Sequence, residues 1–425
     1  MRLPLLLAGT ISLALVSAAA LPAKQSRSPE QVAAAALAEA PVWDGHNDVP
    51  EQLRDRRKNM LQGFDFTDTT STTDAASGTA AMQTDLKRLR AGKVGAQFWS
   101  VYVSAQLNDQ QAVQATLEQI DVTKRLIARH PADLTLCLDS ACVEAAFRNG
   151  RIASLMGMEG GHSIGGSLAV LRQMYALGAR YMTLTHFKNN SWADAATDAP
   201  AHNGLTPLGK DMVREMQRLG MLVDVSHVSE KTMLDVLEVA RAPIIASHSN
   251  AFAINHHPRN VPDVVLDGIK ANGGIVMVNF YPPYVVEAAR LWGANRDAEE
   301  ARLKSLWRGQ PDKAKAALTE WEKANPMPKG SVKDVADHLD YIAKRIGANH
   351  VGLGGDLDGI ETTVVGMEDA STYPALFVEL ARRGWSQQDL EKLASRNMLR
   401  VLKSAEQYAA TQRGAAPIEN PATSF

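Results

Sequence analysis

The stretch VWDGHNDVP, residues 42–50, begins with an apolar pair and ends with an imidazole and a carboxylate two positions apart. In a β-strand, residues i and i+2 lie on the same face, so His46 and Asp48 can point toward one place. Two such side chains can share a metal ion, but Asp-Gly and Asn-Asp pairs also form turns. The stretch alone therefore leaves both a metal site and a plain turn open.

Seven further apolar runs of strand length follow, separated by segments with helical spacing of apolar residues. Several are apolar at nearly every position, as strands buried on both faces of a parallel sheet are. Eight strands that alternate with helices indicate an α/β fold, the (β/α)8 TIM barrel. The alternative is a doubly wound open sheet, which ordinarily carries a glycine-rich phosphate turn after its first strand; no such turn is found. The predicted strands are 42–48, 94–103, 152–159, 179–186, 221–227, 242–248, 273–280 and 350–356.

The connection between the seventh and eighth strands is much longer than the others. Its first part, residues 281–330, carries charged helical sequence and is predicted to be a helical insertion that partly covers the barrel mouth. The expected organisation, in chain order, is a signal peptide, a linker or helix, the barrel domain and a polar C-terminal tail. The corresponding ranges are 1–23, 24–40, 41–406 and 407–425.

The N-terminus has the pattern of an export signal. Met1 and Arg2 precede an apolar run over 3–20 that ends in small residues and lacks the flanks of a stable membrane span. We therefore expect a cleavable signal peptide and a periplasmic or secreted protein. No cysteine follows the run and the C-terminal tail is polar, so no membrane anchor is expected in the mature chain. Cys137 and Cys142 are expected to be structural, either free or paired with each other.

The overall composition is that of an ordinary globular protein, with 45% hydrophobic and 22% charged residues. The formal net charge is −2 and no useful run of Lys and Arg appears. Because a nucleic-acid-binding surface needs concentrated positive charge, nucleic acid is not an expected partner.

Six of the eight predicted strands end in His, Asp or Glu. In a (β/α)8 barrel the carboxyl ends of the strands meet at one mouth, where enzymes of this fold keep their chemistry. A buried group of several imidazoles and carboxylates is costly unless a cation satisfies it. The residues concerned are His46, Asp48, Glu159, His186, His227, His248 and Asp356.

Imidazole and carboxylate ligands without a thiolate suit Zn²⁺, with Mn²⁺ or Co²⁺ as alternatives. The ligands outnumber what one open site requires, and a central carboxylate can bridge two ions. Such a pair can hold a hydroxide as nucleophile and polarise a carbonyl group. Hydrolysis is therefore the predicted chemistry.

Six segments, in order, resemble the membrane dipeptidase (renal dipeptidase) family of metallopeptidases: DGHND, GMEGGHSI, YMTLTHFKNNSWAD, VDVSHVS, ASHSNAFAINHHPRNVPD and VGLGGDLDGI. The resemblance covers residues 41–406. It implies an amidohydrolase-like, metal-dependent hydrolase barrel with two zinc ions per chain. The implied substrates are dipeptides, including those with a D-residue at the C-terminal position, and β-lactams. The resemblance also favours a homodimer.

The same resemblance implies a ligand set for two zinc ions. His46 and Asp48 would bind one ion, His227 and His248 would bind the other, and Glu159 would bridge the two. Each of these residues ends a predicted strand, so the implied ligand set agrees with the pattern described above.

Three more roles follow from the resemblance. His186 would hold the substrate carbonyl oxygen and stabilise the charge that develops on it. Asp356 would accept the proton of the bridging hydroxide and pass it to the leaving amine. Arg259 matches the family's contact with the terminal carboxylate of the substrate, for which a guanidinium group is suited.

Two other kinds of function remain open at this point. A lactonase, phosphotriesterase or other amidohydrolase would keep the metal barrel but cleave a different bond, although Arg259 favours a substrate with a carboxylate. A non-catalytic or tailoring protein on the same scaffold is the second alternative, because a fold alone does not define a function.

Overall fold

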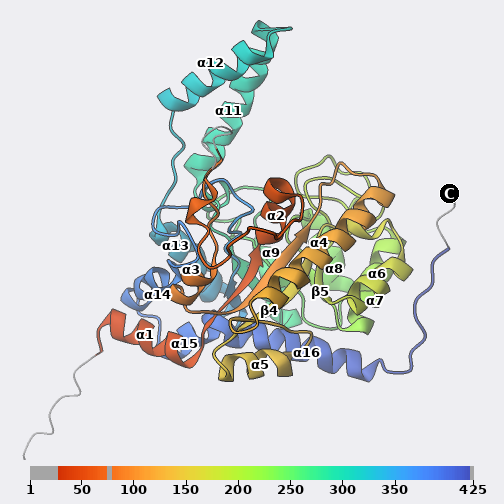
Figure 1. The fold of residues 1–425 in the computed structure, drawn as a ribbon. Helices are drawn as coiled ribbons and strands as arrows, with labels where there is room; N and C mark the ends of the chain where they lie inside the picture. The colour runs from red at the N-terminus through yellow and green to blue at the C-terminus, as the bar shows by residue number, and fades with distance from the viewer. Residues whose placement is uncertain (1–26, 74–78, 422–425) are drawn as a thin grey trace, which may run out of the picture.

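The computed structural model describes residues 27–73 and 79–421. Eight parallel strands form a closed barrel surrounded by helices (Figure 1). Around the barrel the order is β1, β9, β8, β7, β6, β5, β4, β2, and the pairing of β2 with β1 closes the ring. The predicted (β/α)8 barrel is confirmed, and the open sheet is excluded. The strands are β1 (Val42–Asn47), β2 (Val94–Tyr102), β4 (Ile152–Glu159), β5 (Ala179–Thr183), β6 (Leu222–Asp224), β7 (Ile245–Ala246), β8 (Ile275–Val278) and β9 (Val351–Leu353).

All eight barrel strands lie within or close to the predicted ranges, but several end earlier than the sequence pattern suggests. His227 and Asp356 follow β6 and β9 with φ of 67° and 60°, in the left-handed region. A residue in that region cannot continue an extended ladder, so the chain turns and directs these side chains toward the mouth. Sequence analysis did not predict β3 (Leu134–Leu136). This strand pairs with the first residues of β4, and β5 pairs with the later residues of β4.

Side chains alternate along β2 between the barrel interior and the surrounding helices. Ala96 and Phe98 belong to the apolar cluster inside the barrel, whereas Trp99 and Val101 belong to the cluster between strands and helices. The interior cluster is sealed at the amino ends of the strands by α16 (Asn397–Thr411), which lies below the barrel in Figure 1. The interior is therefore apolar at that end, and polar side chains gather at the opposite end.

The outer helices begin and end at residues that commonly cap helices. The helix α7, for example, starts at Pro207 after Thr206, whose side chain accepts a hydrogen bond from the Gly209 amide, and it stops at Gly220 in the left-handed conformation. The outer helices are α1 (Pro29–Glu39), α2 (Val49–Arg57), α3 (Leu86–Ala91), α4 (Asp109–Arg129), α5 (Ser140–Arg148), α6 (Leu168–Ala176), α7 (Pro207–Leu219), α8 (Glu230–Val239), α9 (Asp263–Asn272), α13 (Val332–Ile346), α14 (Tyr373–Arg382) and α15 (Gln387–Glu391).

The segment between β8 and α13 contains α10 (Pro282–Val285), α11 (Glu287–Leu306) and α12 (Pro311–Ala324). The helices α11 and α12 form a hairpin that projects away from the barrel (Figure 1) and is held together by its own small apolar cluster. Because the hairpin points outward, α11 and α12 contribute no side chain to the wall of the mouth cavity described below. The expected cover over the mouth is limited to Tyr281 and Tyr284, which precede the hairpin.

The two cysteines, Cys137 and Cys142, form a disulfide, with their Cα atoms 5.3 Å apart. The helix α16 continues to Thr411, beyond the predicted end of the domain at 406. The predicted signal peptide, residues 1–23, lies outside the described residues. Within the described residues, no helix is both long enough and apolar enough to cross a bilayer.

Candidate metal centre

The barrel mouth brings together the five residues predicted as metal ligands. The carboxylate of Glu159 lies among the others, with Oε2 3.4 Å from His46 Nε2 and Oε1 3.0 Å from His227 Nε2 and 3.4 Å from His248 Nε2. Asp48 Oδ2 lies 3.3 Å from His46 Nε2. One oxygen of Glu159 thus faces His46 and Asp48, and the other faces the remaining two histidines.

These residues form two groups that can each hold a metal ion. In the first group, His46, Asp48 and Glu159, and in the second, Glu159, His227 and His248, all ligand atoms lie within 4.8 Å of one another. The groups share only Glu159. A carboxylate placed between two sets of ligands is the arrangement that a bridging ligand requires.

Several polar atoms of this centre are buried without a partner. His46 Nε2 and both carboxylate oxygens of Asp48 have no hydrogen bond to any described residue, and Asp48 is only 1% exposed. A buried carboxylate that accepts no hydrogen bond costs several kcal/mol on the order-of-magnitude scale for desolvated ions. A divalent cation would satisfy these atoms together, so the donor set fits a metal.

A hydrogen-bond relay determines which nitrogen of His248 faces the centre. Asp224 accepts hydrogen bonds from the backbone amides of Ser226 (3.0 Å) and Ser247 (2.8 Å), and from the hydroxyls of Thr183 (2.5 Å) and Ser247 (2.6 Å). Because a carboxylate only accepts, the Ser247 hydroxyl must donate to it. The Ser247 oxygen then accepts from His248 Nδ1, 2.8 Å away, which leaves the lone pair of His248 on Nε2.

Tyr181 has the same role at His46. Its hydroxyl lies 3.3 Å from the carbonyl oxygen of Gly45, to which it donates, and 2.8 Å from His46 Nδ1, from which it accepts. The lone pair of His46 is thereby on Nε2, toward Glu159. Partners of this kind commonly orient the histidine ligands of metal sites. Sequence analysis identified neither relay, because both join residues on different strands.

The titration behaviour of the histidines agrees with this arrangement. Burial is the main cause that keeps the pKa of His227 and His248 well below the usual value, so both are neutral and can act as ligands. Burial acts the same way on His46, but Tyr181 and the Asp48 carboxylate outweigh it and raise the pKa of His46 well above its usual value. Negative charge is therefore in excess beside His46, where a cation would be stabilised.

His186 and Asp356 lie next to the ligand group. His186 Nε2 is 3.7 Å from Glu159 Oε1, and burial lowers the pKa of His186 to about 4, so that it is neutral. Asp356 Oδ1 is 3.9 Å from His46 Nε2, and its Oδ2 accepts a hydrogen bond from Asn279 Nδ2 at 2.7 Å. Burial is the main cause that raises the pKa of Asp356 well above its usual value. Asn279 was not singled out by sequence analysis, although it also ends a strand segment.

Asp356 also belongs to a third possible metal group, which the sequence did not suggest. Its carboxylate, His46 and His248 have ligand atoms within 4.8 Å of one another. Asp356 is therefore near enough to the centre to act on a group bound there.

Arg259 lies beside the centre but one layer behind the cavity wall. Its guanidinium donates to Ser249 Oγ (3.2 Å) and to the backbone oxygen of His248 (3.3 Å), and it lies 5.2 Å from the ring centroid of Tyr284. Arg259 is 1% exposed, and its Nε has no partner among the described residues. The buried Nε–H group of Arg259 is therefore available to donate a hydrogen bond near the mouth.

A cavity of about 160 Å³ lies over the centre. Its wall includes the four aromatic rings of Tyr102, Phe187, Tyr281 and Tyr284. The residues of the centre that line it are Asp48, Glu159, His186, His227 and Asp356. Pockets that bind drug-sized ligands measure roughly 300–1,000 Å³, so this cavity suits a smaller molecule.

A closed (β/α)8 barrel with candidate metal ligands at its mouth is the arrangement expected of a metal-dependent hydrolase. The model of the membrane dipeptidase family, peptidase family M19, matches residues 30–415. The chain belongs to this family, which makes it a metallo-dipeptidase by class.

Individual relatives agree with this assignment. The chain is 40% identical over 384 residues to dipeptidase tcpJ of Claviceps purpurea (strain 20.1), covering 88% of this chain and 79% of that protein. It is 40% identical over 394 residues to the uncharacterised dipeptidase C3A11.10c of Schizosaccharomyces pombe (strain 972 / ATCC 24843), covering 89% and 84% of the two chains.

Solved structures share the fold. The probable dipeptidase PvdM from Pseudomonas aeruginosa superposes with a TM-score of 0.76 at 23% identity, covering 89% of this chain and 99% of that one. A metallopeptidase from Rhodobacter sphaeroides, solved with a phosphinate mimic of L-Ala-D-Ala, gives a TM-score of 0.69 at 24% identity, covering 86% and 99%.

Proposed function

We propose that this protein is an exported dinuclear zinc dipeptidase. The observation that carries the proposal is the position of Glu159, whose two carboxylate oxygens face two separate groups of ligands. His46 and Asp48 would hold one zinc ion, and His227 and His248 would hold the other. Nitrogen and oxygen ligands without a thiolate support zinc, with two ions per chain.

When bound, the two ions supply Lewis acidity for a carbonyl group and an activated water at neutral pH. His186 is neutral and nearly buried, and it holds the substrate carbonyl oxygen and stabilises the charge that develops there. Its Nε2 points toward Glu159, on the side where the scissile bond would lie.

Asp356 transfers the proton. The hydrogen bond from Asn279 occupies its Oδ2 and leaves Oδ1 directed toward the centre, on the side of His46. From there Asp356 accepts a proton from the attacking water and gives it to the leaving amine, first as general base and then as general acid. Its raised pKa favours the protonated form, from which Asp356 gives the proton to the leaving amine.

Arg259 selects a substrate with a free carboxylate. Its unpartnered Nε and its position against the Tyr284 ring support a contact with the C-terminal carboxylate of a dipeptide. Together with the small cavity, such a contact would limit the substrates to short peptides and to carboxylate-bearing analogues such as β-lactams. We also propose that the enzyme accepts dipeptides with a D-residue at the C-terminal position.

The export proposal is supported by the signal-peptide pattern of residues 1–23, which predicts a periplasmic or secreted enzyme. The resemblance to the family further supports a homodimer. Size-exclusion chromatography with light scattering on the mature chain tests the oligomeric state.

The enzymatic proposal is tested with a panel of L-Xaa-L-Xaa and L-Xaa-D-Xaa dipeptides, a lactone and a phosphotriester, each assayed before and after chelation. We expect release of free amino acids from dipeptides, loss of that activity on chelation and recovery with added zinc. Turnover of the lactone or phosphotriester but of no dipeptide would contradict the proposal.

A further inference from the structure

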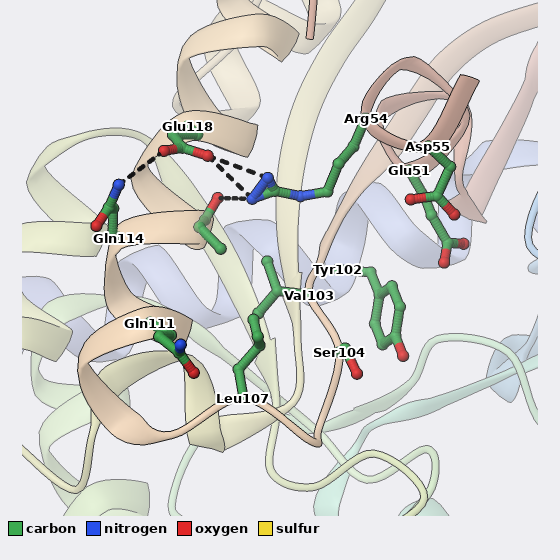
Figure 2. Close-up of a pocket in the computed structure, with 11 residues that line it drawn as sticks. Glu51, Arg54, Asp55, Tyr102, Val103, Ser104, Leu107, Gln111, Gln114 and Glu118 are labelled. Carbon is green, nitrogen blue, oxygen red and sulfur yellow. Dashed lines mark hydrogen bonds and ion pairs between the residues drawn. The ribbon is translucent and has the colours of Figure 1, made fainter. Parts of the chain in front are cut away.

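A second cavity, of about 610 Å³, lies beside the cavity over the metal centre. The side chains of Glu51 and Tyr102 line both cavities, so these two residues form the boundary between the two spaces. Figure 2 shows this side cavity between α2, the end of β2 and α4. A substrate group that passes Glu51 and Tyr102 therefore enters a larger space.

The order of the strands indicates which end of a dipeptide points there. In the ring, β2 is four strands away from β7 in both directions, so the ends of β2 and β7 lie across the mouth from each other. Arg259 follows β7, and Tyr102 ends β2. This step rests on the proposed function: with its carboxylate at Arg259, a dipeptide extends its N-terminal residue toward Tyr102 and the side cavity.

One part of the wall of the side cavity is apolar and suits the methylene groups of a long side chain. Val103, Leu107 and Ala115 contribute apolar side chains to it. The larger volume leaves room for a side chain of several methylene groups, which apolar walls would stabilise.

The charged groups of the side cavity are unevenly paired. Glu118 accepts hydrogen bonds from Arg54 at 3.0 and 3.1 Å and from Gln114 at 3.0 Å (Figure 2), so its charge is compensated. Glu51 and Asp55 line the cavity and form no ion pair with any described residue. Burial and the carboxylates of Asp48 and Glu159 raise the pKa of Glu51 to about 9, so a cation that enters beside Glu51 would be stabilised.

These two carboxylates lie on one face of α2. Glu51 follows the predicted ligand Asp48 by three residues, and Asp55 follows Glu51 by four, the spacing that places side chains on the same side of a helix. A row of carboxyl groups therefore continues from the metal centre into the side cavity.

We propose that the side cavity accepts the side chain of the N-terminal residue of the dipeptide and selects a long side chain that ends in a cation, as in Lys-Xaa and Arg-Xaa dipeptides. Glu51 is the specificity-determining residue, and Asp55 adds to its effect. Dipeptides with an acidic N-terminal residue are disfavoured by the same carboxylates.

The test compares kcat/KM for Lys-Ala and norleucyl-Ala, which differ in the terminal ammonium group, on the zinc-loaded enzyme. A hydrogen bond to a charged group supports a preference of about tenfold or more for Lys-Ala. In Glu51→Gln we expect this ratio to fall at least about fivefold, and in Asp55→Asn by a smaller factor. Because both substrates are assayed on one preparation, the ratio does not depend on metal content or on the folded fraction.

Asp312→Asn removes one negative charge from α12, outside both cavities, and is the matched control; its ratio should equal that of the unaltered enzyme. Hydrolysis of norleucyl-Ala with no preference for Lys-Ala, or a preference that both Glu51→Gln and Asp55→Asn retain, would overturn the inference while the dipeptidase function stands. Absence of turnover with every dipeptide would overturn the proposed function and this inference with it.

Discussion

Replacing Asp224 with Asn should weaken metal binding, although Asp224 lies behind the predicted ligands and touches no metal in our account. In the native chain the Ser247 hydroxyl donates to Asp224 (2.6 Å) and accepts from His248 Nδ1 (2.8 Å). An Asn amide at the same place presents a donor to Ser247. The hydroxyl then turns and donates to His248 Nδ1, and the proton of the imidazole moves to Nε2, the atom that faces Glu159.

The histidine must reverse this tautomer before it can bind a metal ion. Loss of such an outer partner typically lowers metal affinity by about 10- to 100-fold, which is about 1.4–2.7 kcal/mol. We expect the loss at the ion held by His227 and His248, with the ion held by His46 and Asp48 retained. Competition with a zinc chelator of known affinity, followed for both equivalents of metal, measures the two sites separately.

Thr183→Val is the matched control, because the Thr183 hydroxyl donates to the same carboxylate but does not contact His248. Unfolding of each metal-free variant shows whether the fold is retained. The reasoning is refuted if Asp224→Asn binds both ions as tightly as the unaltered protein, or if Thr183→Val loses as much affinity for the second ion.

Three further predictions follow from the site and the fold. Asp356→Asn should bind both ions but lose about 10²- to 10⁴-fold in kcat, as expected for a lost general base. Kinetics on protein of measured metal content test this prediction, and turnover equal to that of the unaltered enzyme would contradict it. Arg259→Met should raise KM for Ala-Ala by at least about tenfold while leaving metal content unchanged, and an unchanged KM argues against the carboxylate contact. Burial lowers the pKa of His338 to about 4, although the hydrogen bond from its Nε2 to the Val285 oxygen acts in the opposite direction. Its Nδ1 accepts a hydrogen bond from the Ala251 amide, which requires the neutral ring. The unfolded chain therefore takes up this proton near pH 6.5, and stability should fall by about 2 kcal/mol between pH 7 and pH 5. Urea unfolding of metal-free protein should show a smaller fall in His338→Gln, and an equal fall means that other groups cause it.

The sequence predicted the barrel and the group of candidate ligands because both depend on short-range pattern. Apolar runs of strand length indicate buried parallel strands, and parallel strands in a barrel must end at a common mouth. A His, Asp or Glu at the end of a strand can therefore be recognised one strand at a time, as with Glu159 at the end of β4.

The supporting contacts could not be read in this way. Tyr181 reaches His46 across 135 positions of the chain, and Asn279 reaches Asp356 across 77, so neither pair leaves a local pattern. From the sequence alone, Tyr181 on β5 is indistinguishable from the other apolar residues of a buried strand. Sequence analysis missed β3 for a different reason. Its three residues are too few to show the alternation of apolar and polar residues that indicates a strand.

The orientation of the helical insertion was also out of reach. Its sequence predicts charged helices, but the apolar cluster of Leu303, Ala314 and Leu318 packs within the hairpin and not against the barrel. A helical pattern does not say which partner an apolar face will find. For this reason the insertion covers the mouth only through Tyr281 and Tyr284, which precede the hairpin.

The central claim is that Glu159 joins two zinc ions. Diffraction data collected on crystals of the zinc-loaded protein at energies above and below the zinc absorption edge test it most directly. We predict two anomalous peaks about 3.5–4 Å apart, one beside His46 and Asp48 and the other beside His227 and His248, with Glu159 between them. A single peak, or peaks that do not contact Glu159, would contradict the account.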